Sequence, residues 1–242
     1  MIWFRKAVLI VHGFAGGTYD EEFLANYLEK NACLDVYTYT LPGHSHISNN
    51  KSTCKDWIQA SENMMNMLIQ NGYREIYVIG HSMGGVIATY LAAKYSQVKK
   101  LVLVAPAFRY LTFEGNDFNL LNAIKLTPEI LGQYGKDEVA SRLTKLPIST
   151  VKEFIKLVDK YQTIASDVKV PTLIIQGTKD KIVPPKTAEY VYDQLKSKQK
   201  KVIYVNNSTH DVFREQKKEG ASHVVERFLK YGIKNIQSIT YL

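Results

Sequence analysis

The fold is decided by the stretch Glu75-Ile76-Tyr77-Val78-Ile79-Gly80-His81-Ser82-Met83-Gly84-Gly85-Val86, an apolar run that turns into a helical pattern at a serine. Residues 75–79 are typical of a strand buried on both faces of a parallel sheet, and residues 83–95 have helical spacing. A serine held in a strained turn between them needs small residues two positions away on either side, and Gly80 and Gly84 supply them. The stretch therefore predicts a strand, a sharp turn and a helix, with the Ser82 hydroxyl presented at the turn. A helix-capping serine is the competing interpretation.

Apolar runs of the same kind recur at residues 7–11, 34–39, 100–104, 171–176 and 201–205. Helical patterns accompany them, at residues 20–30, 53–71, 83–95, 186–196 and 216–231. This alternation predicts an α/β fold with right-handed crossovers, in which a mostly parallel sheet of about six strands has helices on its faces. Ligands of such sheets bind at the carboxyl ends of the strands, so the loops after strands are where we expect functional residues.

A long segment, residues 107–167, separates the fourth and fifth strands, where a crossover normally needs far fewer residues. It is apolar and helix-compatible, and its prolines and glycines divide it into about three helices. We therefore predict a single domain, 1–242, in which residues 107–167 form an inserted helical cap. The apolar side chains of this cap either line an acyl or aryl pocket or only attach the cap to the sheet. They are Phe108, Tyr110, Leu111, Phe113, Phe118, Leu120 and Leu121.

The composition argues against several classes of protein. The hydrophobic fraction of 45% and the charged fraction of 22% are typical of a soluble globular chain. The net charge of +8 comes from dispersed lysines, which favours solubility over nucleic-acid binding. No apolar run near the N-terminus is long enough for a signal or a membrane span, and the two cysteines, Cys33 and Cys54, suit a reducing compartment. We expect a cytoplasmic protein with no stable membrane insertion.

A serine hydroxyl becomes a nucleophile when a base takes its proton, and that base needs a carboxylate to orient it. Among the six histidines we expect His210 to be the base, because it lies directly after the last predicted strand. His44 and His46 follow the second strand, where either one lines the pocket or is an ordinary loop histidine. The remaining three are interpreted as structural, surface or wall residues: His12, His81 and His223.

Asp180 is the expected acid, because it follows the strand at residues 171–176 and so lies at the carboxyl edge of the sheet. The resulting chain order of serine, aspartate and histidine is the one found in α/β-hydrolases. Asp211 is a rival acid. Because it is adjacent to His210 in sequence, it has difficulty reaching the imidazole nitrogen that faces away from the serine, so we prefer Asp180.

The oxyanion formed during attack on a carbonyl needs backbone amides as donors. Met83, directly after the serine, supplies one, and Phe14 in the loop Val11-His12-Gly13-Phe14-Ala15-Gly16-Gly17 is expected to supply the second while its ring lines the acyl pocket. A phosphate cradle is the alternative for this loop, but no GK[ST] follows it and GxGxxG is absent. Since side chains and amides supply the chemistry, we expect no metal and no organic cofactor.

Together these motifs resemble the α/β-hydrolase superfamily over nearly the whole chain, and within it the small bacterial carboxylesterases and monoacylglycerol-lipase-like enzymes. The resemblance implies a serine esterase with Ser82, Asp180 and His210 as its triad. Two features depart from the family pattern: the family's opening antiparallel strands are not evident before residue 7, and Thr209 replaces the usual glycine before the histidine. The matching segments are His12-Gly13-Phe14, Leu41-Pro42-Gly43-His44-Ser45, Gly80-His81-Ser82-Met83-Gly84-Gly85, Gly177-Thr178-Lys179-Asp180-Lys181-Ile182-Val183-Pro184 and Ser208-Thr209-His210.

The leading hypothesis is hydrolysis of a small-molecule carboxylic ester, with a short- to medium-chain or monoacyl group, through an acyl-enzyme intermediate. Acyl transfer, thioester hydrolysis and carbon–carbon bond cleavage are alternatives, because the same triad serves them all. A non-catalytic binding protein of the same fold is disfavoured, since it has no reason to retain the serine, acid, histidine and elbow glycines together.

Overall fold

The centre of the molecule is a six-stranded sheet with the order β2-β1-β3-β4-β5-β6, in which every neighbouring pair of strands is parallel. The computed structural model describes residues 5–44, 51–108, 148–236 and 240–242. From β1 the chain moves to one edge of the sheet and then returns to build the other side from β3, so the ligand crevice of this topology lies at the carboxyl ends of β1 and β3. The strands are β1 (Lys6–Val11), β2 (Asp35–Thr38), β3 (Glu75–His81), β4 (Val98–Val104), β5 (Thr172–Gly177) and β6 (Lys200–Val205).

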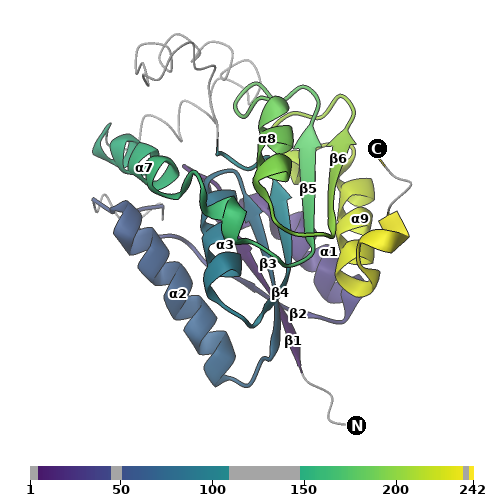
Figure 1. Cartoon of the computed structure of the whole chain (residues 1–242), viewed down its shortest axis with the longest axis horizontal. Coiled ribbons are helices and arrows are strands. Elements are labelled where there is room, and N and C mark those ends of the chain that lie inside the picture. The colour runs from purple at the N-terminus through teal and green to yellow at the C-terminus, as the bar shows by residue number, and fades with distance from the viewer. Residues whose placement is uncertain (1–4, 45–50, 109–147, 237–239) are drawn as a thin grey trace.

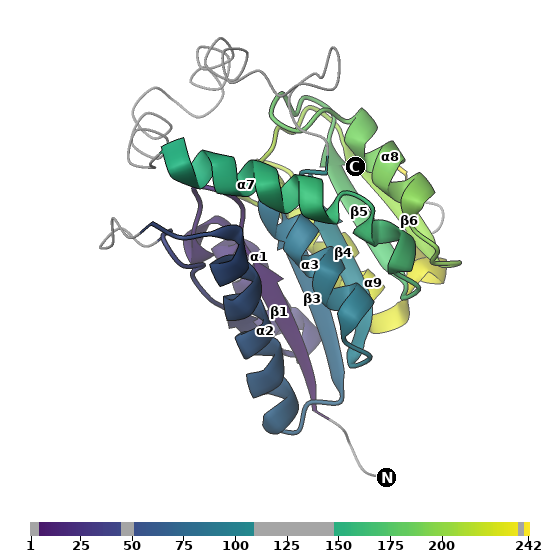
Figure 2. The same ribbon diagram turned by 60° about the vertical axis from the view of Figure 1, so that its left-hand side comes forward.

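Helices cover both faces of the sheet (Figure 1). On one face, α1 (Glu22–Ala32) packs against α9 (Lys218–Tyr231). The other face carries α2 (Cys54–Gln70), α3 (Met83–Lys94) and α8 (Lys186–Gln194). Figure 2 shows α7 (Ile148–Tyr161) crossing over α2 and α3, both of which it contacts. Four short 3-10 helices complete the described elements: η1 (Thr18–Asp20), η2 (Ile164–Asp167), η3 (Val212–Arg214) and η4 (Ile233–Ile236).

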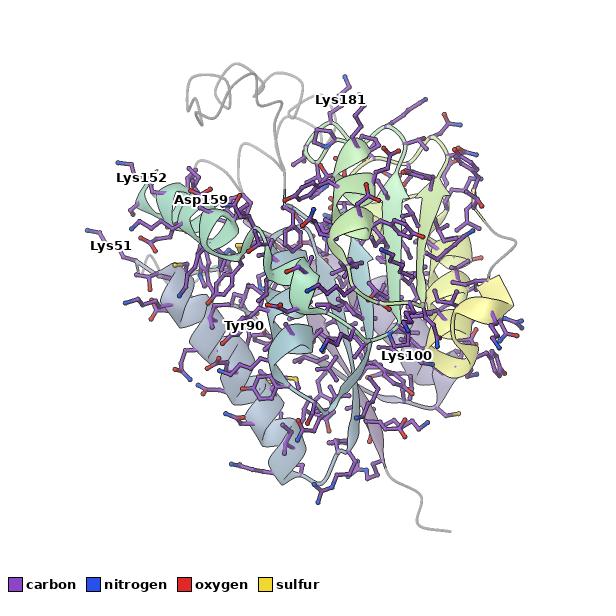
Figure 3. All side chains as sticks on the ribbon, viewed as in Figure 1. Lys51, Tyr90, Lys100, Lys152, Asp159 and Lys181 are labelled. Carbon is purple, nitrogen blue, oxygen red and sulfur yellow. The ribbon has the colours of Figure 1, made fainter. Side chains whose placement is uncertain are left out.

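The core consists of two apolar clusters, one on each face of the sheet, so the strands are buried on both sides. At the centre of one layer, α3 is buried on nearly every side. Its Tyr90 donates a hydrogen bond to Glu62 of α2, and Figure 3 shows Tyr90 extending toward that helix. From β4, Lys100 extends to α9 and donates to the carbonyls of Phe228 and Leu229, which satisfies acceptors near the carboxyl end of that helix (Figure 3).

The predicted fold class is confirmed: the sheet has six parallel strands, and each expected strand and helix in the described residues lies within two residues of its predicted ends. Most of the predicted cap at 107–167 lies outside the described residues, as residues 109–147 are not described. Of that segment the structure describes α7 and η2, and α7 packs over the edge of the sheet that carries the expected site. The cap and the single-domain assignment for 1–242 therefore stay predictions.

Candidate active site

Ser82 occupies the turn between β3 and α3 in a backbone conformation that side chains rarely adopt, with φ 53° and ψ −118°. Two glycines make this turn possible. A Cβ on Gly80 would lie 2.2 Å from the carbonyl oxygen of Gly84, and a Cβ on Gly84 would lie 2.1 Å from the carbonyl oxygen of Val11. Because the amide of Ser82 also donates to the carbonyl of Val104 at 2.9 Å, strands β1, β3 and β4 together fix the corner.

The structure places His210 beside Asp180, with 2.8 Å between His210 Nδ1 and Asp180 Oδ2. The same carboxylate accepts the amides of Ile182 and Val183, both at 2.9 Å, and the side-chain amide of Gln176 at 3.0 Å. Burial alone would raise the pKa of Asp180, but His210 and these amides outweigh it and hold that pKa below its usual range. Asp180 is therefore a carboxylate at neutral pH, which places a proton on Nδ1 of His210 and leaves Nε2 able to accept one.

The acid and the histidine meet because the loops after β5 and β6 are joined through their backbones. The amide of Lys179 donates to the carbonyl of Ser208 at 2.9 Å. A Cβ on Gly177 would lie 2.1 Å from the carbonyl oxygen of Thr209. The backbones of the two loops therefore lie so close together that only glycine fits at position 177. Thr209, which replaces the family's usual glycine, is held by Glu215, which accepts its amide at 3.0 Å and its hydroxyl.

The loop after β1 is held in place by His12. Its Nδ1 donates to the carbonyl of Gly13 at 2.8 Å, and its Nε2 accepts the amide of Leu41 at 3.0 Å. Burial, and to a lesser extent the neighbouring His44, lowers the pKa of His12 to about 4. A neutral ring with one donor and one acceptor therefore joins this loop to the loop after β2 at neutral pH.

The two expected oxyanion donors come from two separate segments, the loop after β1 and the start of α3. A Cβ on Gly13 would lie 3.1 Å from the Cβ of Ser82, so the loop that carries Phe14 runs directly beside the nucleophile. Met83 is the first residue of α3, and the amide of a first helical residue has no acceptor within the helix. The positive end of the helix dipole also favours negative charge at this point.

Phe14 is the centre of an aromatic cluster that joins the loop after β1 to α2 and α7. Its ring stacks on Phe154 of α7, with centroids 4.9 Å apart, and makes edge contacts with Trp57 at 6.3 Å and His44 at 5.8 Å. Nε2 of His44 is buried and has no hydrogen-bond partner among the described residues, and burial lowers the pKa of this ring. Phe108 is also buried, in the same apolar cluster as Phe154. The other residues considered for the pocket lie outside the described part of the chain: His46, Tyr110, Leu111, Phe113, Phe118, Leu120 and Leu121.

A buried ion pair next to the serine is the feature that sequence reasoning missed. Nδ1 of His81 lies 2.7 Å from Glu21 Oε1, and both side chains are less than a tenth exposed. Burial alone would lower the pKa of His81, but Glu21 outweighs it and raises that pKa to about 9. Asp211, the rival acid, lies 3.8 Å from Nε2 of this same ring. In the sequence, the only signs of this pair are that His81 precedes Ser82 and that Glu21 lies at the start of a helix. Acids at helix starts are too common to indicate a buried pair.

Three further observations concern the described residues alone. No three of their histidine, cysteine, aspartate and glutamate side chains gather in a way that could hold a metal ion. None of their helices is long and apolar enough to span a membrane. A cavity of about 500 Å³ lies at the amino ends of β5 and β6, remote from Ser82, and is lined by Lys169, Pro171 and residues 196–199.

The fold agrees with comparisons to known families. A family model described as the alpha/beta hydrolase fold matches residues 6–143, more than half of the chain. The chain therefore belongs to the α/β-hydrolase family, as the sequence resemblance implied. A second model, described as serine aminopeptidase S33, matches residues 117–217.

Individual relatives cover most of the chain at low identity. The thermostable monoacylglycerol lipase of Bacillus sp. (strain H-257) is 26% identical over 224 residues, which span 84% of this chain and 82% of that relative. The carboxylesterase of Bacillus subtilis (strain 168) is 23% identical over 246 residues, which span 93% and 92% of the two chains. A solved structure from work on the metagenome-derived lipolytic enzymes LipS and LipT has a TM-score of 0.75 at 23% identity and covers 94% of each chain. At this identity the structural match establishes the shared fold.

Proposed function

We propose that this protein is a serine hydrolase that cleaves carboxylic esters through an acyl-enzyme intermediate. The observation that carries the proposal is the 2.8 Å contact between His210 Nδ1 and Asp180 Oδ2, at the sheet edge where Ser82 sits in a strained turn. An acid, a base and a nucleophile with these environments are what acyl transfer to serine requires. The names of the curated relatives, a monoacylglycerol lipase and a carboxylesterase, support an ester as the substrate.

In the proposed reaction, Nε2 of His210 takes the proton of the Ser82 hydroxyl as its oxygen attacks the ester carbonyl. Asp180 keeps the other ring proton on Nδ1 and stabilises the imidazolium that forms. The amides of Phe14 and Met83 receive the developing oxyanion. His210 then protonates the departing alcohol, and a water molecule activated by the same ring releases the acid from the serine.

The aromatic cluster around Phe14 favours an apolar acyl or aryl group near the reacting carbonyl. Phe14 carries one of the proposed oxyanion amides, so a group bound to that amide lies close to its ring and to the rings stacked against it. One of these rings, Phe154, comes from α7, which belongs to the segment predicted as a cap. We propose esters of short to medium acyl chains or monoacyl esters as the substrates.

The test is covalent labelling with a fluorophosphonate probe, together with a series of p-nitrophenyl esters of increasing acyl length. Ser82→Ala is expected to abolish both labelling and turnover. Ser96→Ala removes the hydroxyl of an exposed serine in the loop between α3 and β4, and serves as the matched control with the labelling and rates of the parent protein. Labelling that persists in Ser82→Ala would identify another nucleophile, and the absence of turnover with every acyl length would refute the esterase assignment.

A further inference from the structure

His81 joins the nucleophile and the base through a path that the triad does not include. It immediately precedes Ser82 in the elbow, and its Nε2 lies 3.1 Å from the backbone carbonyl oxygen of His210, 129 residues further along the chain. Its ring is 4.8 Å from the His210 ring, measured between centroids. We propose that His81, with Glu21 as its counter-ion, is a positioning residue that fixes the backbone of His210 relative to Ser82. This inference rests on the proposed function.

Both ring nitrogens of His81 face oxygen atoms, so a doubly protonated ring can donate to both. Nδ1 faces Glu21 Oε1 at 2.7 Å, and Nε2 faces the His210 carbonyl at 3.1 Å. A neutral imidazole has one N–H and would leave one of these oxygens opposite a lone pair. The pair is buried, with side-chain exposures of 8% and 3%, so the two charges are compensated by each other rather than by water.

The charged groups around His81 come from four segments, and most of them favour the imidazolium. Glu21 precedes α1, Asp20 ends η1, and Asp211 follows His210 in the loop after β6. Asp20 is itself paired with Arg214 of η3 at 3.1 Å. His12 opposes the charge weakly from the loop after β1, but burial keeps that ring neutral at ordinary pH. The negative groups next to the ring outnumber the positive ones, which holds the proton on His81.

We expect the hydrogen bond from His81 Nε2 to the His210 carbonyl to break at alkaline pH and to persist at acid pH. Above about pH 9 His81 loses one proton, because its pKa is raised to about 9, and the Glu21 carboxylate keeps the remaining proton on Nδ1. The lone pair of Nε2 then faces the His210 carbonyl. Burial raises the pKa of Glu21 to about 7. Its Oε2 is buried and has no hydrogen-bond partner within the described part of the chain, so it can take a proton while Oε1 continues to accept from His81.

The first test compares kcat, KM and backbone amide exchange of segment 206–215 in the parent protein and in His81→Ala. A displacement of about 1 Å at the base lowers kcat on the order of 100-fold, and the loss of a transition-state contact leaves KM within about threefold. The amides of 206–215 are expected to exchange at least about tenfold faster, since opening is no longer opposed by this contact. Because His81→Ala leaves Glu21 buried without a partner, Glu21→Gln/His81→Ala keeps the test decisive if the single variant does not fold.

The second test uses Glu21→Gln, whose side-chain amide can donate to Nδ1 and leave the proton on Nε2 for the His210 carbonyl. We expect kcat of the parent protein to fall as pH rises through about 9 and kcat of Glu21→Gln to stay level there. Glu226→Gln is the matched control, since it breaks a buried acid's contacts with Lys230 and His223 on α9 and should match the parent in every assay.

Each outcome bears on one proposal. Unchanged amide exchange in the variants that lack His81 overturns the positioning role whether or not the protein is an esterase. Equal kcat in those variants, or a shared alkaline fall in Glu21→Gln, also overturns it. A parent protein that neither reacts with the fluorophosphonate probe nor hydrolyses any ester overturns the proposed function, while the exchange rates still decide how the loop is held.

Discussion

Gly84→Ala adds one methyl group at the point where α3 passes under the loop after β1. The new Cβ would lie 2.1 Å from the carbonyl oxygen of Val11 and 2.6 Å from that of His12, both backbone atoms that cannot rotate away. To reach 3.0 Å, the shortest distance that real Cβ atoms tolerate, the helix and the loop must separate by about 0.9 Å. Overpacking of this kind costs about 1–3 kcal/mol of unfolding free energy.

The same separation moves the Ser82 elbow away from the loop that carries Phe14, so we expect kcat to fall about 100-fold. Gly220→Ala is the matched control, because Gly220 is also in a helix and its Cβ would meet nothing within 4 Å. That variant should gain about 0.5–1 kcal/mol from helix propensity and keep its activity. Urea unfolding and p-nitrophenyl ester kinetics on both variants measure these effects. Gly84→Ala with the stability gain of Gly220→Ala and kcat within threefold of the parent would refute the packing argument.

Two further predictions concern the buried histidines and the acid. Asp180→Asn is expected to lower kcat by about 10⁴-fold with the fold retained, because the new amide can donate to Nδ1 of His210 and favour the wrong tautomer. Steady-state kinetics and melting temperatures measure the two effects. A loss of kcat below tenfold would contradict the prediction. His12 has a folded pKa of about 4 against 6.5 when unfolded, so its stabilising contribution is complete above pH 6.5 and declines by about 3 kcal/mol as pH falls to 4. Urea unfolding across this range should show a smaller decline for His12→Gln, and parallel declines would count against the assignment.

The six strands were predictable because each is buried on both faces and so reads as a continuous apolar run. Their ends were less predictable, since pairing rather than hydrophobicity decides them. β3 continues through Gly80 and His81 because both residues still pair with β4. β4 begins at Val98, before two lysines, because Lys100 extends its charged end to the carbonyls of α9 while its backbone stays in the ladder.

In the candidate site, too, the residues marked by local sequence were predictable, and those defined by long-range contacts were not. Ser82, Asp180 and His210 could be proposed from sequence because each lies within five residues after a strand, and the carboxyl ends of the strands converge at one edge of a parallel sheet. Glu21 could not, because its environment is created by contacts with His81, 60 residues away. In sequence it is one of three consecutive acids at the start of a helix, a pattern typical of solvated residues.

The geometry also separates the residues that we propose for the chemistry from those that we propose for the choice of ester. The elbow and the histidine loop are fixed where backbones approach so closely that a Cβ at Gly84 or Gly177 would meet a carbonyl oxygen at 2.1 Å. The Phe14 ring, by contrast, is contacted by Phe154 from α7, which does not belong to the sheet. Substitutions in α7 are therefore expected to alter KM and acyl preference, whereas substitutions at the two glycines alter kcat for every ester alike.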